Sequence, residues 1–311
     1  MDALAKVFET IRVNPFSHFS LDLAAPWGFA IEARRRALYC MIGGRSCELW
    51  LPDSGQRLSL EPGDLIMLPR AGRSVWRSDA TARVVPFERL MATLSVQRGQ
   101  RLVRVGDSHI EATVLTGGVF WTSEVSAHPV LGALPAIVHL QHRQTPNSDW
   151  MSPLAALMHY ELARQGAGSE AMLKRLSDML LIHAVQASLA TRPDAAPSWL
   201  AGLIDGRIAP AIRAMHAHPE REWSVDALAR MAAMSRTAFA VRFRQVTGET
   251  PLQYLARWRM YLAARQLRET PLSTEAISAT VGYKNSAAFQ KAFKRIMRVP
   301  PGEYRRRPAQ P

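Results

Sequence analysis

The feature that most constrains this 311-residue chain is a motif that occurs twice in its last third. The segments "TAFAVRFRQVTGETPLQY" (237–254) and "SAAFQKAFKRIMRVPPGEY" (286–304) each contain Phe-x-x-x-Phe followed by Arg or Lys, and then Pro-x-x-Tyr. The spacing between these residues is the same in both copies. The sequence therefore predicts two copies of one structural unit.

Each copy is preceded by a segment that begins with a helix-capping serine, "SVDALARMAAM" from Ser224 and "STEAISATVGY" from Ser273. After a short turn, a second helix is expected to start near Ser235 in the first copy and near Asn285 in the second. Two helices joined by a tight turn predict a helix-turn-helix, whose second helix enters the major groove of DNA.

Between the copies, the segment 250–270 predicts one helix about 30 Å long. A rod of that length would place the two second helices about one DNA turn apart on one side of the duplex.

The second helix of each copy has two different faces. At about 100° per residue, the four phenylalanines of the motifs fall on one face, so we expect them in the core. The opposite faces carry small, amide and cationic side chains, which suit base edges and phosphates. The candidate DNA-binding residues are Arg236, Thr237, Ala240, Val241, Arg244, Gln245, Ser286, Ala287, Gln290, Lys291, Lys294 and Arg298.

Positive charge is concentrated in the same part of the chain. Residues 205–311 hold 19 Lys and Arg against 8 Asp and Glu, whereas residues 1–204 hold 20 against 18. A basic segment with regular apolar spacing predicts a folded surface for a polyanion, most often nucleic acid.

Residues 19–124 contain short apolar runs separated by turn residues, a pattern typical of a β sandwich or barrel. The segment "ALYCMIGGRSCELWL" (37–51) predicts a hairpin with Gly43 and Gly44 at the centre of its turn. In such a hairpin Cys40 and Cys47 would face each other. A redox pair is one hypothesis for them, and packing as two buried apolar side chains is the other.

Four aromatic residues of this region are candidates for the lining of an effector pocket, with burial in the core as the alternative. They are Trp27, Tyr39, Trp50 and Trp76. After residue 152 the apolar spacing becomes helical, and "TRPDAAPSW" (191–199) has the composition of a linker. The expected domains are therefore 1–190, a linker 191–204, and 205–311.

No set of histidines and cysteines has the spacing of a metal site, and no phosphate-binding or nucleophile motif occurs. We therefore expect no metal, no cofactor and no enzymatic activity. The chain has neither a long apolar segment nor a signal peptide, which predicts a cytoplasmic protein.

The segments "LARMAAMSRTAFAVRFRQVTGETPLQYL" (228–255) and "ISATVGYKNSAAFQKAFKRIMRVPPGEYRRR" (277–307) closely resemble the DNA-binding domain of AraC/XylS-type transcription regulators. The first 190 residues resemble the members whose N-terminal half is a cupin-like, effector-binding barrel. The stretches that carry this second resemblance are "APWGFAIE" (25–32), "LEPGDLIMLP" (60–69), "AHPVLGALP" (127–135) and "GSEAMLKRLSDMLLIHAVQ" (168–186).

The resemblance implies an α+β fold class, with a cupin-like β barrel and helical segment followed by an all-α domain with two helix-turn-helix motifs. It also implies a homodimer that responds to a small-molecule effector and activates transcription by contacting RNA polymerase, with repression as the other mode. In the family an Arg often stands two positions after the first core aromatic of each recognition helix. Lys291 fills the second such place and Val241 the first, which favours a thymine-methyl or phosphate contact from the first helix.

Two other classes of protein remain open at this stage. A sequence-indifferent architectural DNA binder would depend on phosphate contacts alone. A cupin enzyme fused to a basic domain would require a metal site.

Overall fold

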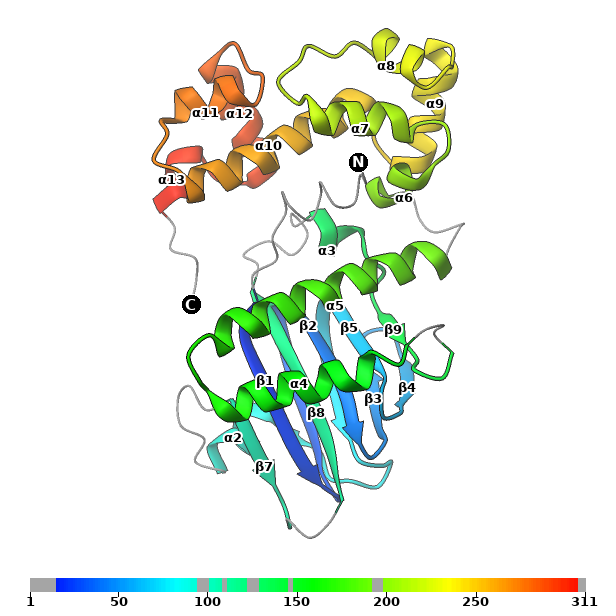
Figure 1. Ribbon diagram of the computed structural model, residues 1–311, viewed down its shortest axis with the longest axis vertical. Coiled ribbons are helices and arrows are strands. Elements are labelled where there is room, and N and C mark those ends of the chain that lie inside the picture. Colours follow the sequence, from blue (N-terminus) through cyan, green and yellow to red (C-terminus); the bar gives the residue numbers. More distant parts are fainter. Residues whose placement is uncertain are drawn as a thin grey trace. The chain divides into compact units, whose positions relative to one another are not determined.

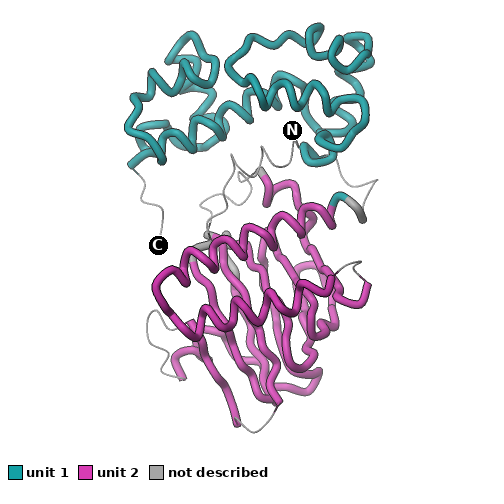
Figure 2. Tube along the Cα trace, viewed as in Figure 1, with its two compact units in different colours: residues 1–12, 189–311 teal, residues 13–188 magenta. Residues whose placement is uncertain are grey.

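The computed structural model describes residues 15–93, 101–107, 111–121, 129–144, 148–191 and 198–306. The chain forms two compact units, of which one holds residues 13–188 and the other includes residues 189–311 (Figure 2). The first is a β-sheet with helices on it, and the described residues of the second form helices without strands (Figure 1). The expected α+β combination is confirmed.

Within the described residues, the first unit is built on a nine-stranded sheet. The strand order is β4-β3-β5-β2-β8-β1-β7, with β6 beside β2 and β9 beside β5. The strands are β1 (Pro15–Ala24), β2 (Gly28–Gly44), β3 (Cys47–Leu51), β4 (Gln56–Leu60), β5 (Leu65–Arg77), β6 (Val85–Pro86), β7 (Leu102–Val105), β8 (Ala112–Trp121) and β9 (Val138–Leu140).

The core of this unit gathers side chains from strands that are far apart in the sheet order. Leu60 of β4 and Val103 of β7, near its two ends, belong to the same buried apolar cluster as Leu49 of β3 and Leu115 of β8. The sheet therefore curls around this cluster, as the strands of a barrel do.

The predicted hairpin at Gly43 and Gly44 is wrong. β2 pairs with β5, β6 and β8, whereas β3 pairs with β4 and β5, so the strands on either side of this turn are not partners. Gly44 does turn the chain, with φ at 65°. The local signal predicted the turn, but the 17-residue β2 finds its partners elsewhere in the chain.

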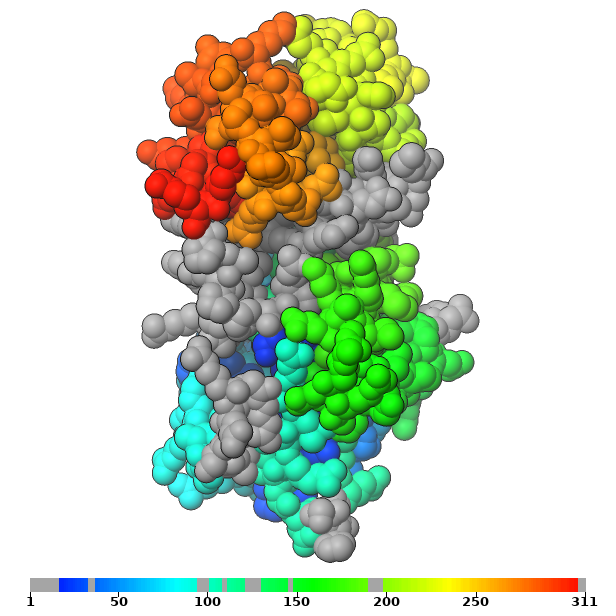
Figure 3. All heavy atoms as spheres, turned by 60° about the vertical axis from the view of Figure 1, so that its left-hand side comes forward, coloured from blue at the N-terminus to red at the C-terminus, as the bar shows by residue number. Residues whose placement is uncertain are grey.

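Two helices, α4 (Met151–Arg164) and α5 (Ser169–Thr191), lie side by side against the sheet (Figures 1 and 3), as the helical spacing predicted. Polar contacts join α5 to strands β1 and β2. Ser177 Oγ lies 2.9 Å from His18 Nε2 and 2.6 Å from the Tyr39 hydroxyl. Burial, with the charge of Arg101, lowers the pKa of His18 to about 4. The short helices of the unit are α2 (Phe87–Thr93) and α3 (Pro129–Ala133).

The helical unit begins earlier than the sequence indicated. Helix α6 lies within the segment 191–204 that we expected to be a linker, and Ser198 caps it by accepting a hydrogen bond from Ala201 N at 3.2 Å. Trp199, Leu200 and Leu203 are buried there. The helices of this unit are α6 (Trp199–Ile204), α7 (Ala209–Ala217), α8 (Val225–Met231), α9 (Arg236–Thr247), α10 (Pro251–Glu269), α11 (Thr274–Thr280), α12 (Ser286–Met297) and α13 (Pro301–Arg306).

The long helix between the repeats is present as predicted. Thr250 caps α10 with a capping box, in which Gln253 N donates to the threonine side chain and Thr250 N donates to Gln253 Oε1 at 3.1 Å. The first motif (α8 and α9) precedes α10, and the second motif (α11 and α12) follows it (Figure 1).

Candidate DNA-binding surface

Each motif has a phenylalanine pair at its centre. Phe239 and Phe243 of α9 have ring centroids 5.6 Å apart, and Phe289 and Phe293 of α12 have centroids 5.7 Å apart. All four side chains are fully buried, as the helical spacing predicted.

The Pro-x-x-Tyr part of the repeat completes each core. Pro251 begins α10 and Pro301 begins α13, and in each helix the tyrosine stands three residues later. The Tyr254 ring meets Phe243 edge-on at 5.5 Å and 86°, and the Tyr304 ring meets Phe293 at 5.5 Å and 81°. The spacing is repeated because both copies build the same edge-to-face aromatic contact.

Side-chain caps fix where the two second helices begin. Ser235 Oγ accepts a hydrogen bond from Ala238 N at 3.2 Å at the start of α9. Asn285 Oδ1 accepts from Ala287 N and Ala288 N, at 2.8 and 3.2 Å, at the start of α12. These caps orient the helices whose outer faces carry the candidate DNA-binding residues.

The structure brings the predicted residues of each helix to one solvent-facing side. Val241 is 52% exposed, so its apolar side chain is available for contact on the outer face of α9. On the first helix the exposed residues are Arg236, Thr237, Val241, Arg244 and Gln245, with Ala240 partly exposed. On the second they are Ala287, Gln290, Lys291 and Lys294, with Ser286 partly exposed. Arg298 is exposed just beyond α12, where it caps the helix in the left-handed conformation with φ at 62°.

Two arginines of α9 make ion pairs within the unit. Arg236 Nη1 lies 3.4 Å from Asp226 Oδ2 of α8, in an exposed pair. Arg242 Nη2 lies 2.6 Å from Asp205 Oδ2, and Oδ1 of the same carboxylate accepts from the backbone N–H of Ile208. Burial opposes these bonds, but together they hold the pKa of Asp205 below its usual range. Arg242 therefore anchors α9 to the turn between α6 and α7.

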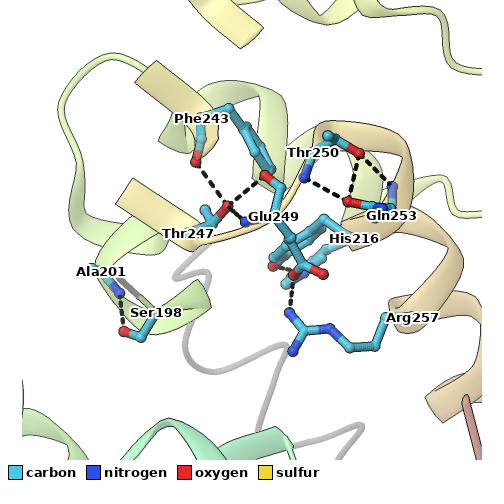
Figure 4. A network of polar contacts seen from close by, with 10 residues as sticks. Ser198, Ala201, His216, Phe243, Thr247, Glu249, Thr250, Gln253 and Arg257 are labelled. Carbon is cyan, nitrogen blue, oxygen red and sulfur yellow. Dashed lines mark hydrogen bonds and ion pairs between the residues drawn. The ribbon is translucent and has the colours of Figure 1, made fainter. Parts of the chain in front are cut away.

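The junction between α9 and α10 is held by polar contacts (Figure 4). Thr247 Oγ1 donates to Phe243 O at 2.8 Å, and Arg257 pairs with Glu249. Beneath them, His216 Nε2 lies 2.7 Å from the Tyr254 hydroxyl. This network fixes the direction in which α9 meets the long helix.

Comparison with known proteins identifies the same two parts. Residues 2–190 match the family model described as "Cupin", and residues 228–307 match the model described as "Helix-turn-helix domain". A protein of Streptomyces lividans named "Putative AraC-like transcription regulator" is 32% identical over 313 residues, which cover 100% of both chains.

The chain belongs to the AraC family of transcription regulators. Another relative, the transcriptional regulator AlkR of Acinetobacter baylyi, is 28% identical over 98% of this chain and 99% of its own. Among solved structures, the DNA-binding domain of AdpA in complex with a target DNA is 31% identical, with a TM-score of 0.31. It covers 32% of this chain and 89% of that one. As an AraC-family member, the protein is a sequence-specific DNA-binding transcription regulator.

In this AraC-family chain, the four aromatic residues predicted to line one pocket do not lie together. Trp27 and Trp76 belong to the buried cluster inside the curled sheet. Tyr39 contacts Ser177 of α5 instead, and Trp50 is half-buried beneath Arg57, whose Cζ lies 5.3 Å from the ring centroid. Alternate residues of a strand face opposite sides, so Tyr39 and Trp50 face away from the side that their neighbours Cys40 and Leu49 occupy.

The two cysteines are both free and buried within the cluster inside the sheet. They do not face each other across a strand pair, because Cys40 pairs with Ile66 and Cys47 pairs with Leu60. Burial raises the pKa of Cys47 to about 12 and places that of Cys40 well above its usual value. The cross-strand geometry behind the redox hypothesis is therefore absent, and both groups are thiols at neutral pH.

Within the described ranges, no group of three or more His, Cys, Asp or Glu side chains is arranged to hold a metal ion. The same part of the chain contains no helix that is both long enough and apolar enough to cross a membrane.

Proposed function

We propose that α9 and α12 read two neighbouring blocks of one promoter site, about one DNA turn apart. The observation that carries this proposal is the pairing of two equally built motifs on one helix, each with an exposed outer face. Two such faces on one chain suit successive turns of the major groove.

The two faces take different chemical roles in this proposal. Lys291 and Gln290 of α12 contact base edges, since a lysine pairs with guanine acceptors and an amide suits adenine. Val241 and Ala240 of α9 contact a thymine methyl group. Arg298 binds a phosphate, which adds affinity without sequence preference.

In the proposed mechanism, the cupin-like unit binds a small molecule without converting it. Binding changes the arrangement in which the two DNA-binding units of a homodimer meet the promoter. The regulator then activates transcription in the cytoplasm by contacting RNA polymerase. One observation supports a polar ligand group near Trp27. The indole N–H of this buried residue has no hydrogen-bond partner among the described residues. A small molecule with an acceptor oxygen would satisfy it.

The proposed reading of DNA is tested by selecting retained sequences from random duplexes with the full-length protein at physiological salt. Enrichment of two short blocks about 10 base pairs apart is the expected result. Binding without any enriched sequence would instead indicate an architectural DNA binder, with a steep dependence on salt.

The effector site is tested with a library of small metabolites, by measuring the melting temperature of the full-length protein. A compound that uses the Trp27 indole N–H would stabilise the wild type and stabilise Trp27→Phe less, because phenylalanine keeps an aromatic ring but has no donor. Equal stabilisation of both proteins by every active compound would exclude this role of Trp27.

A further inference from the structure

The loop that precedes the first motif contacts the turn of the second motif. Gly282, in the turn between α11 and α12, has φ at 83°, and a Cβ built on it would lie 2.5 Å from the carbonyl oxygen of Glu220. Glu220 belongs to the loop between α7 and α8, which approaches the α11–α12 turn in Figure 1. The glycine therefore permits a close backbone contact between two parts of the chain 62 residues apart.

One arginine of α10 connects three segments at this contact. Arg259 Nε donates to Pro219 O at 2.7 Å, and its Nη2 donates to Arg221 O at 2.9 Å. Its guanidinium carbon also lies 5.6 Å from the centroid of the Tyr283 ring, beside Gly282. Hydrogen bonds from a charged donor to carbonyl oxygens are among the stronger polar contacts in proteins.

An ion pair lies beside the arginine. Lys284 Nζ is 2.7 Å from Glu222 Oε1, and both side chains are exposed. An exposed pair of this kind contributes little to stability alone. It nevertheless joins the residue just before the Asn285 cap of α12 to the loop just before the Ser224 cap of α8.

We propose that these contacts set the orientation of α9 relative to α12, and so determine which separation of two DNA blocks the protein accepts. We name the group the inter-motif cluster, and it consists of Pro219, Glu220, Arg221, Glu222, Arg259, Gly282, Tyr283 and Lys284. The inference rests on the proposed tandem reading of DNA by the two helices.

The physical argument concerns rotation about a single connection. A helix that alone joined two packed motifs would leave each motif free to turn slightly where it meets the helix. The inter-motif cluster adds direct contacts between the two motifs, at Gly282 and at Lys284, and Arg259 of the helix binds the loop that makes them. These additional contacts oppose such turning. Each base pair added between two major-groove sites rotates one site relative to the other by about 35°. A modest rotation of one motif relative to the other is therefore enough to change which separation of the two blocks the protein fits.

The test uses the full-length protein and duplexes that carry the two selected blocks at the selected separation, or one base pair closer or farther. Arg259→Met removes the donors and keeps the side-chain stem. The matched control is Arg265→Met, which removes one charge from the same helix, where Arg265 forms an ion pair with Glu269. Glu222→Gln is a second variant, which breaks the exposed ion pair without threatening the fold and is expected to act in the same direction.

We expect the wild type and Arg265→Met to prefer the selected separation by about tenfold or more, as for a mismatched site. Arg259→Met should reduce this preference severalfold, with unchanged affinity for a duplex that carries a single block. A wild-type preference that persists in both Arg259→Met and Glu222→Gln would overturn the role of the cluster. Absence of any two-block preference in the wild type would instead overturn the tandem reading, and this inference with it.

Discussion

The two helix-turn-helix motifs are alike inside and different outside. Their phenylalanine pairs have nearly equal centroid distances, and a tyrosine closes each core in the same edge-on geometry. Outside, α9 exposes Val241 where α12 exposes Lys291. The difference teaches that the core specifies how a motif folds, while the residues between the core positions specify what it reads, so the two properties vary independently.

The motifs also differ in what lies beneath them. Under the first, the His216 ring stacks 3.9 Å from the Trp258 ring and contacts the Tyr254 hydroxyl. The second rests on an apolar cluster that includes Met260, Leu267 and Ile277. Only the first motif's support thus contains a buried group that titrates near neutral pH in an unfolded chain, as far as the described residues extend.

The largest expected effect tests whether the two cores are equivalent. Phe243→Ala and Phe293→Ala should each lower the free energy of unfolding by about 3–5 kcal/mol, because each removes a fully buried ring. Hydrogen exchange measured by motif should show loss of protection in the altered motif first. Equal loss in both motifs from either change would show that they unfold as one cooperative unit.

The next largest expected effect is a difference between the motifs in how far their stability falls at low pH. Burial lowers the pKa of His216 from 6.5 to about 3. The unfolded chain therefore binds a proton in a pH range where the folded chain does not, and stability falls as the pH is lowered from about 6.5 toward 3. Between pH 6.5 and 4.5 the loss is about 2–3 kcal/mol.

The measurement is hydrogen exchange at the two pH values, corrected for intrinsic exchange rates. Exchange should increase in α7 and α9 more than in α11 and α12. In His216→Gln this additional dependence on pH should disappear. A uniform change across both motifs, unaffected by the substitution, would contradict the assignment to His216.

A smaller effect concerns what each outer face reads. Lys291→Ala should cost about 1–3 kcal/mol on the selected DNA site and much less on scrambled DNA, because a base contact is lost. Val241→Ala removes only apolar contact and should cost less. Fluorescence anisotropy with both duplexes measures the two losses. Equal losses for Lys291→Ala on both duplexes would assign this side chain to a phosphate.

The smallest effect lies in the turns. The position of Gly282 is occupied in the first motif by Ala233, which has φ at 51°, in the left-handed region that an alanine adopts at a cost. Ala233→Gly should therefore raise the free energy of unfolding by about 1 kcal/mol or less. Gly282→Ala should lower it by more than this, because a Cβ at this position would also clash with the Glu220 carbonyl oxygen. Denaturant unfolding measures both changes. A loss of stability in Ala233→Gly would show that the turn is not strained.

The features that the sequence predicted correctly depend on residues close together in the chain. The starts of the second helices near Ser235 and Asn285, the buried phenylalanines and the boundaries of α10 all follow from signals within one or two helical turns. The errors concern partners that are distant in the chain. A Gly-Gly turn contains no information about the strands that β2 pairs with. The segment that forms the buried helix α6 lies outside both the basic region and the repeated motif, so neither of these signals indicated it.

The inter-motif cluster was missed for the same reason. Arg259 is one of many arginines in a basic segment, and nothing near it in the sequence indicates that it binds the carbonyl groups of Pro219 and Arg221. Gly282 was the available signal, since a glycine in one turn and an alanine in the other indicates that only one turn is closely approached.

The capped length of α10 has a consequence for how such a regulator can evolve. Because a helix turns about 100° and rises about 1.5 Å per residue, inserting a single residue into α10 would swing the second motif around the rod and off the face of the duplex that the first motif occupies. Substitutions on the exposed side of α10 leave the relative rotation of the two motifs unchanged. The exposed positions of α10 should therefore accept changes of residue much more readily than the helix accepts a change of length.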